Sequence, residues 1–251
     1  MTVLTFNAGS VFLPEMVGTA LLILLGCGVV AGVLLAHSKA QNSGWVVITF
    51  GWGLGVMIGA ASVADYGGAN LNPAVTLGVW ANGGFTSSFG DKIPIYVAGQ
   101  LCGAFIGATL VYLAYYLHWK DTEDPGLKLA VFSTGPAVRN YAWNLVTEII
   151  GTFVLVFGIF SVTGNSGVAS SGTGILFVAL IVVGIGMSLG GPTGYAINPA
   201  RDLGPRIMHA ILPIPGKGSS DWQYAWVPVV GPLIGGLLGG ILHHAFFPIP
   251  H

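Results

Sequence analysis

The tripeptide Asn-Pro-Ala occurs twice in this chain, as Asn72-Pro73-Ala74 and as Asn198-Pro199-Ala200, within otherwise apolar sequence. Asparagine can cap the first free amides of a helix, and proline at the first helical position gives up only a donor that has no partner there. Each motif therefore predicts a helix start, and the second helix should run to about His209.

The residues before each motif are rich in Gly and Pro, including the stretch from Gly186 to Gly194, and we expect them not to be helical. At membrane depth, exposed backbone carbonyls are tolerated only where they line a water-filled path or are buried in protein. Arg201 makes the same demand, because a guanidinium that faces lipid costs several kcal/mol or more.

The composition indicates an integral membrane protein. Of 251 residues, 53% are hydrophobic and only 7% are charged, whereas about a quarter of the residues are charged in soluble domains. About 20 helical residues cross a bilayer core of about 30 Å. Six apolar runs meet this length, at 11–36, 44–64, 93–117, 142–163, 173–190 and 224–247.

The sequence gives no support for a cleaved signal peptide, for nucleic-acid binding or for a metal site. No basic region or cleavage site precedes the first apolar run, which we therefore interpret as a retained span. The net charge of −1 and the absence of basic clusters argue against nucleic acid as a partner. Cys27 and Cys102 lie in apolar runs without metal-ligand spacing, so we expect free thiols, no metal and no cofactor.

The two halves of the chain repeat each other. Glu15 with Gly18-Thr19 returns as Glu148 with Gly151-Thr152, and the Asn-Pro-Ala motif returns 126 residues later. Glycines spaced four apart, which allow close helix packing in lipid, also return: Gly99, Gly103 and Gly107 correspond to Gly231, Gly235 and Gly239. Each half holds three spans, so the repeats, about 11–117 and 142–247, are inverted in the membrane. The two half-helices should meet N-terminus to N-terminus.

We expect one transmembrane channel domain over 1–251, with an all-α fold of six transmembrane helices and two re-entrant half-helices. We interpret 164–172 as a flexible loop that joins the halves. The connection 118–141 carries most of the water-facing charge and is interpreted as a solvated loop, with a role at a pore mouth as the alternative.

These motifs resemble those of the major intrinsic protein family of aquaporins and glycerol facilitators, and the resemblance covers essentially the whole chain. Asp202 after the second motif resembles the glycerol-conducting branch, and Tyr112, Arg206 and Pro232-Leu233 look like its other markers. The resemblance maps the selectivity filter onto Trp52, Gly186, Tyr195 and Arg201.

Three positions, two of them in the filter, distinguish this chain from some relatives. Orthodox water channels carry His where this chain has Gly186, so we expect free space there that an imidazole would fill. Many glycerol facilitators have Phe at the position of Tyr195, and some relatives have His at that of Asn70. The Tyr195 hydroxyl would add a donor and an acceptor opposite the backbone carbonyls. The alternative is that it bonds a neighbouring backbone group and the ring acts as Phe would.

The resemblance implies a passive channel for glycerol, water and similar small neutral solutes such as urea. A hydroxyl that loses water without a new partner costs about 2–7 kcal/mol, so the wall must supply hydrogen bonds. We expect the side-chain amides of Asn72 and Asn198 to donate at the centre and Arg201 to donate near the outer end. The expected carbonyl ladder is Gly67, Gly68, Ala69 and Asn70 with Gly194, Tyr195, Ala196 and Ile197.

Exclusion of ions and protons would follow from the same arrangement. Each half-helix N-terminus carries about half a positive charge, and Arg201 adds a full one. Glu15 and Glu148 are intramembrane carboxylates, interpreted as acceptors that brace the loops before the half-helices; proton coupling is the alternative.

Other interpretations remain open. The chain could be a facilitator mainly for undissociated small hydroxy acids such as lactic acid, a proton-coupled carrier, or a structural membrane protein. An intramembrane enzyme would have to use Ser170-Ser171 and His243-His244, which lack a Gly-x-Ser-x-Gly setting. We assign no catalytic residue and expect no enzyme.

The resemblance further implies a homotetramer in the plasma membrane with both termini in the cytoplasm. This orientation conflicts with the positive-inside tendency, but we follow the family because there are few charges. It puts Lys39, Lys120, Lys128, Arg139, Arg206 and Lys217 on the outer side and only Lys92 inside.

Overall fold

The computed structural model describes residues 11–247, which fold into twelve helices and contain no strand. The predicted all-α fold is confirmed. The six long apolar helices are α1 (Phe12–Leu34), α2 (Trp45–Gly67), α5 (Ile93–Ala114), α8 (Tyr141–Thr163), α10 (Gly174–Leu189) and α12 (Val227–Phe246). The half-helices are α3 (Pro73–Asn82) and α11 (Pro199–Ile211). The proposed domain 1–251 includes residues 1–10 and 248–251, which lie outside the described residues.

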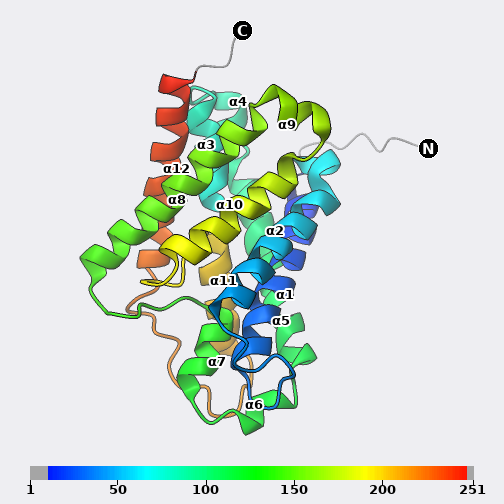
Figure 1. Cartoon of the computed structure of the whole chain (residues 1–251), viewed down its shortest axis with the longest axis vertical. Helices are drawn as coiled ribbons and strands as arrows, with labels where there is room; N and C mark the ends of the chain where they lie inside the picture. The colour runs from blue at the N-terminus through cyan, green and yellow to red at the C-terminus, as the bar shows by residue number, and fades with distance from the viewer. Residues whose placement is uncertain (1–10, 248–251) are drawn as a thin grey trace, which may run out of the picture.

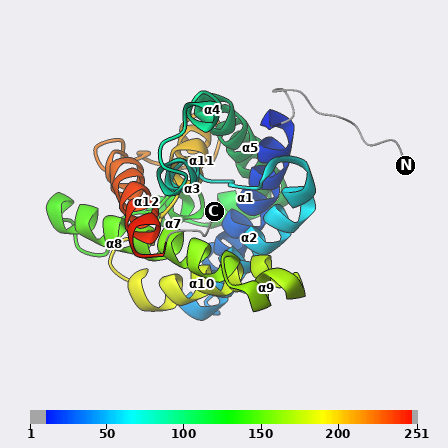
Figure 2. The same ribbon diagram turned by 90° about the horizontal axis from the view of Figure 1, so that it is seen from above.

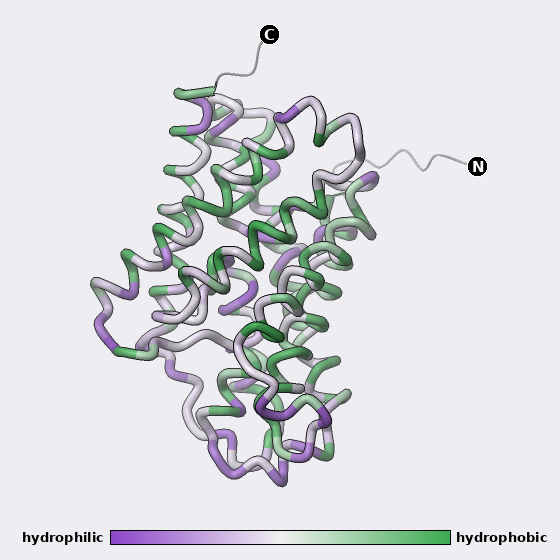
Figure 3. Tube along the Cα trace, in the orientation of Figure 1, coloured by the Kyte–Doolittle hydropathy of each residue, from purple (hydrophilic) through white to green (hydrophobic). Residues whose placement is uncertain are grey.

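Five of the expected spans are long and apolar enough to cross a membrane, whereas α10 has only 16 residues. At 1.5 Å per residue this helix is about 24 Å long. Its last turn contains Gly186, so the segment from Gly186 to Leu189 is helical and not part of the irregular stretch, contrary to expectation. Apolar residues fill the middle of the molecule and polar residues gather at its two ends (Figure 3).

The long helices surround α3 and α11, as the view from above shows (Figure 2). Each half-helix packs against a long helix of the other repeat. A side chain at Gly236 of α12 would collide with the carbonyl of Ala74 in α3. In the same way, a Cβ at Gly204 of α11 would lie 2.5 Å from the Ala104 Cβ of α5. The two repeats therefore exchange their half-helices.

Glycines also bring together the helices within each repeat, as the four-residue spacing predicts. Gly103 of α5 faces the carbonyl of Met16 in α1, and Gly235 of α12 faces the carbonyl of Ile149 in α8, both too closely for a side chain. The pairs α1–α5 and α8–α12 are thus equivalent, and each carries one buried glutamate toward the centre, Glu15 and Glu148.

The connection 118–141 is not the solvated loop that its charges suggest. It contains α6 (His118–Asp121) and α7 (Pro125–Phe132), which lie at one end of the bundle (Figure 1). The side chains of Trp119 and Phe132 are fully buried and stack on each other. Even Lys128 is buried, and its ammonium donates to the carbonyl of Pro215.

The segment 164–172 is also not a flexible join between the halves. It contains α9 (Ser166–Ser171), capped by the side chain of Asn165, and it connects α8 to α10 within the second repeat. The helices that separate the repeats are α6 and α7. Helix α9 and the short α4 (Ser87–Gly90) lie at the end where α1 begins and α12 ends, opposite α6 and α7 (Figure 1).

Candidate pore and selectivity filter

Both half-helices begin with the predicted asparagine cap. The Asn72 Oδ1 accepts from the backbone N–H of Ala74 at 2.8 Å. The Asn198 Oδ1 accepts from the N–H groups of Ala200 and Arg201, at 3.0 and 3.2 Å. Proline follows each cap at the first helical position. The positive ends of the two helix dipoles therefore converge on the two asparagines.

The loops before the caps share an unusual backbone. Ala69 and Leu71 have φ of 51° and 52°, and the residues 126 positions later, Tyr195 and Ile197, have φ of 38° and 43°. Left-handed backbone costs a non-glycine residue about 1–2 kcal/mol, so another contact must hold it in place. Because the same conformation occurs at equivalent positions of both repeats, it is a shared feature of the two loops.

Two buried carboxylates provide that contact. Glu15 accepts from the backbone N–H groups of Asn70 and Leu71, both at 2.7 Å. Glu148 accepts from the N–H groups of Ala196 and Ile197 at 3.0 and 2.9 Å. With the N–H groups held by glutamate, the loop carbonyls are free to turn the other way. The bracing geometry expected for both glutamates is present.

Each glutamate has further polar neighbours. Glu148 also accepts from the Thr193 hydroxyl at 2.7 Å. Gln100 donates its side-chain amide to Glu15 at 2.7 Å and to the Thr76 hydroxyl at 3.0 Å. Both carboxylates are therefore enclosed by donors, and neither is exposed.

The two cap asparagines bond across the centre. The Asn72 Nδ2 donates to the Ile197 carbonyl at 2.8 Å, and the Asn198 Nδ2 donates to the Leu71 carbonyl at 2.9 Å. One amide hydrogen of each asparagine is used in this way and one remains. The Ile197 carbonyl, expected in the ladder, is thus already bonded, as is that of Gly67, which accepts from the Tyr96 hydroxyl at 3.4 Å.

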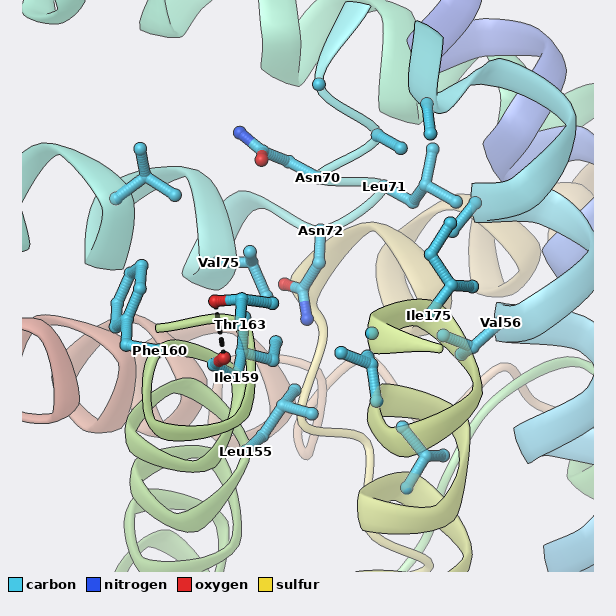
Figure 4. A pocket seen from close by; sticks show the side chains of 18 of the residues that line it. Val56, Asn70, Leu71, Asn72, Val75, Leu155, Ile159, Phe160, Thr163 and Ile175 are labelled. Carbon is cyan, nitrogen blue, oxygen red and sulfur yellow. Dashed lines mark hydrogen bonds between the residues drawn. The ribbon is translucent and has the colours of Figure 1, made fainter. Parts of the chain in front are cut away.

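A cavity of about 450 Å³ extends from the asparagines toward α9. Asn70, Leu71 and Asn72 lie on one wall, and apolar side chains such as Ile159 and Ile175 lie on the facing wall (Figure 4). Gly68 and Ala69 complete the ladder side. The Thr163 hydroxyl is satisfied by its own helix, through the Ile159 carbonyl at 2.7 Å (Figure 4).

A second cavity, of about 40 Å³, continues on the other side of the asparagines. It is lined by three of the four predicted filter residues, Trp52, Tyr195 and Arg201. The two cavities share Asn72 and Asn198 in their walls. The cavity toward α9 is thus the larger one, and the cavity at the predicted filter residues is the smaller.

Arg201 lies over the Trp52 ring, and both are predicted filter residues. Its guanidinium carbon is 3.9 Å from the Trp52 ring centroid, a cation–π distance. Its Nη1 also points to the Phe132 carbonyl at the end of α7, 3.4 Å away. The side chain is 6% exposed. The arginine is therefore fixed between an aromatic face and a carbonyl.

Gly186 lies behind the filter wall and not in it. A Cβ at this position would lie 2.8 Å from the Tyr195 Cζ and 2.8 Å from the Thr49 Cγ2. The Tyr195 ring thus occupies the space that we expected to be free. The expectation of a vacancy at Gly186 was wrong, because the ring of a residue nine positions later fills it.

The Tyr195 hydroxyl matches neither sequence-based alternative. Its oxygen is buried and has no hydrogen-bond partner among the described residues. It therefore neither bonds a neighbouring backbone group nor presents an exposed polar surface to the path. The Trp52 Nε1 is likewise buried without a partner in residues 11–247.

Asp202 and Arg206 form a buried ion pair next to the filter, and both are fully buried. The Arg206 Nε donates to Asp202 at 2.8 Å. Arg206 also donates to the carbonyls of Thr134 and Ser220, each at 2.8 Å. The pair thus ties α11 to the loop after α7 and to the loop after α11. Thr134 and Phe132 were missed by sequence reasoning; the apolar run 129–132 was the available signal for Phe132.

The residues of a hypothetical enzyme do not come together. The Ser170 and Ser171 hydroxyls donate to backbone carbonyls within α9, those of Gly167 and Val168. The His243 Nδ1 instead lies 3.0 Å from the Asn82 side chain at the end of α3. Cys27 and Cys102 are free thiols, as expected, and the described residues hold no cluster of potential metal ligands.

Long apolar helices around two capped half-helices, with a cavity on either side of the two cap asparagines, define a multi-pass transmembrane channel. A family model described as Major intrinsic protein matches residues 4–243. The chain belongs to the major intrinsic protein family.

Several known proteins resemble the chain over most of its length. The probable glycerol uptake facilitator protein of Thermotoga maritima is 58% identical over 222 residues, 88% of this chain and 93% of the relative. The glycerol uptake facilitator protein of Bacillus subtilis is 53% identical over 94% of this chain and 84% of the relative. The X-ray structure of the aquaglyceroporin from Plasmodium falciparum is similar with a TM-score of 0.83 and 29% identity, covering 96% of this chain and 98% of that one.

Proposed function

We propose that this chain is a passive channel that conducts glycerol, water and similar small neutral solutes such as urea, and that excludes ions and protons. The observation that carries the proposal is the pair of cavities that share Asn72 and Asn198 in their walls, with carbonyl-bearing loops on one side and apolar side chains on the other. The relatives named as glycerol uptake facilitators support the choice of glycerol. The chain is not an enzyme.

The wall chemistry suits a polyol. The loop residues Gly68, Ala69 and Asn70 in the wide part, with Tyr195 and Ala196 at the narrow part, would offer backbone acceptors to hydroxyl groups. Each acceptor offsets part of the cost of about 2–7 kcal/mol for an unpartnered hydroxyl. The apolar wall would meet the carbon side of the solute.

Ion exclusion is proposed to come from fixed positive charge. The half-helix N-termini converge at Asn72 and Asn198, and Arg201 stands in the narrow cavity beyond them. Cations would meet three positive elements in a site that contains little water. The amide hydrogens that remain on the two asparagines would orient a central water so that it cannot relay a proton.

Passive conduction is favoured over proton-coupled transport. A coupling carboxylate must exchange protons with the path, but Glu148 is 1% exposed and accepts three hydrogen bonds. Glu15 is equally enclosed. Both carboxylates accept hydrogen bonds from backbone N–H groups, which supports a structural role.

Facilitation mainly of undissociated hydroxy acids such as lactic acid is not favoured. That alternative needed the Tyr195 hydroxyl to face the solute. The hydroxyl oxygen is instead buried, and the ring packs against α10 at Gly186. The filter would present a mostly aromatic wall there, as Phe would.

The cellular setting is also part of the proposal. A multi-pass channel for an external solute would act in the plasma membrane, and the family resemblance favours a homotetramer with one path in each subunit. The large exposed apolar residues of α8, among them Trp143 and Ile150, suit contact with lipid or with another subunit.

Reswelling of proteoliposomes in glycerol, urea or erythritol tests the proposal. Wild-type vesicles should reswell with glycerol much faster than empty vesicles, without a proton gradient. Val182 lines both cavities, so Val182→Trp should block flux. Val146→Trp, on the exposed side of α8, is the matched control and should conduct. Glycerol flux that needs a proton gradient, or that survives in Val182→Trp, would contradict the proposal.

A further inference from the structure

Trp45 lies at the first position of α2, directly after Gly44, and its side chain reaches α10. The indole Nε1 donates to the carbonyl of Gly186 at 2.8 Å. This carbonyl needs an external donor, because α10 ends at Leu189 and the last four carbonyls of a helix lack partners within it. Trp45 therefore caps the end of α10 at the position next to the filter.

The same indole contacts the filter residue Tyr195. The two ring centroids are 5.7 Å apart, and the planes meet at 76°, an edge-to-face arrangement that aromatic pairs favour. Tyr195 thus has the solute path on one side and Trp45 on another. One side chain holds both the backbone behind the filter and the ring that forms its wall.

Two glycines at the C-terminal end of α10, one in its last turn and one at its C-cap, make room for this aromatic pair. Gly186 and Gly190 are one turn apart, so they lie on the same face of the helix. A Cβ at Gly190 would lie 2.6 Å from the Tyr195 Cδ1 and 2.9 Å from the Trp45 Cζ2. With a Cβ at Gly186 excluded by the Tyr195 Cζ at 2.8 Å, the Tyr195 ring is seated between α10 and the indole.

We propose that Trp45 is a positioning residue of the filter, which sets its width by fixing the Tyr195 ring against Gly186 and Gly190. Trp45 lines neither cavity, so it acts through Tyr195 and does not touch the solute. The inference rests on the proposed function of the path. Without the indole, the ring gains room on the side away from the path, and the filter widens.

The test compares two polyols in reconstituted vesicles. Erythritol has one carbon and one hydroxyl more than glycerol, so the ratio of erythritol to glycerol permeability reports width. This ratio does not depend on the number of folded channels. In Trp45→Leu, which removes the N–H and the ring edge, we expect the ratio to rise about threefold, the scale of one lost aromatic or hydrogen-bonded contact. In Trp45→Phe, which keeps a ring, the rise should be smaller.

Trp143→Leu is the matched control. Trp143 is also near the start of a long helix but is 70% exposed, and its replacement should leave the ratio unchanged. An unchanged ratio in both Trp45 variants, with normal glycerol flux in the wild type, would overturn this inference alone. Should the Leu variant not reconstitute, Trp45→Phe decides the matter. A wild type that conducts no glycerol would overturn the proposed function and this inference together.

Discussion

The carboxylate of Asp202 accepts two hydrogen bonds from Thr134, one from its backbone N–H and one from its hydroxyl, each 2.7 Å long. This contact joins the first turn of α11 to the chain just after α7. Two residues earlier, the Phe132 carbonyl faces the guanidinium of Arg201. The loop after α7 and the predicted filter residue Arg201 are therefore linked through buried polar contacts.

Replacing Thr134 by Val should destabilise the protein, because it removes one donor from a buried carboxylate. Hydrogen bonds to charged groups contribute about 1.5–3 kcal/mol, so we expect a loss of that size, read as a lower Tm in detergent. Thr147→Val is the matched control, since the Thr147 hydroxyl bonds only to its own helix. Equal Tm values for both variants would show that the Asp202 contact contributes nothing measurable.

Arg201→Val should open the path to cations. A unit charge about 5 Å away at an effective dielectric constant of about 20 contributes about 3 kcal/mol, or about two orders of magnitude in cation entry. Proton and potassium leak from vesicles should rise while glycerol flux is retained. Arg139→Val removes a surface arginine that pairs with Asp221 at 2.6 Å, and it should stay tight. An Arg201→Val channel that stays tight to ions would contradict this role of Arg201 and would assign ion exclusion to the half-helix N-termini at the two asparagines.

Glu148→Gln should weaken the loop before α11. The amide group that replaces one carboxylate oxygen would face N–H donors, so at least one buried donor loses its acceptor at a cost of about 1–3 kcal/mol. We expect a lower Tm together with reduced glycerol flux, because the carbonyls lose their orientation. Glu123→Gln, on the exposed connection between α6 and α7, should change neither quantity. Full flux with intact Tm in Glu148→Gln would refute the bracing role.

Tyr195→Phe should change transport little. The hydroxyl is buried without a partner among the described residues, so its removal relieves a desolvation cost and should not lower Tm. The ratio of lactic acid uptake at low pH to glycerol uptake should equal that of the wild type. A drop in that ratio would restore the hydroxy-acid alternative.

Orientation can be tested with single cysteines at the two ends of the molecule. We expect Glu123→Cys, between α6 and α7, to react with an impermeant thiol reagent outside intact cells, and Ser170→Cys, in α9, to react only after lysis. Both positions are exposed. Thr122, next to the first site, is unsuitable because it is 3% exposed and bonds to His118 and Ala36. The reverse labelling pattern would invert the assigned topology.

The helices and the half-helix starts could be predicted because local rules decide them. Asn72 and Asn198 cap the helices that begin directly after them, and apolar length defines the spans. The side-chain arrangement of the filter could not be predicted, because it depends on contacts between distant segments. The Tyr195 ring fills the space at Gly186, and its backbone has a left-handed φ of 38° that the sequence did not indicate.

The interpretation of the connection 118–141 as a solvated loop was wrong for a related reason. Its charges are real, but Lys128 is drawn inward by a carbonyl of the loop after α11, and Phe132 is buried by stacking on Trp119. Pro215 lies far along the chain, and no local pattern indicates that Trp119 and Phe132 stack on each other. A single buried cation changes the interpretation of a short polar segment, whereas an apolar run of about 20 residues with few or no charges predicts a span by itself.

The exchange of half-helices between the repeats also affects the order in which the chain can fold during synthesis. During synthesis α3 is made long before α12, yet Ala74 of α3 packs on Gly236 of α12. The first re-entrant segment must therefore wait, incompletely packed, until most of the chain has been translated. Neither repeat can pack its own half-helix alone. We therefore expect a truncated chain to be degraded as incompletely folded and not to form a smaller channel.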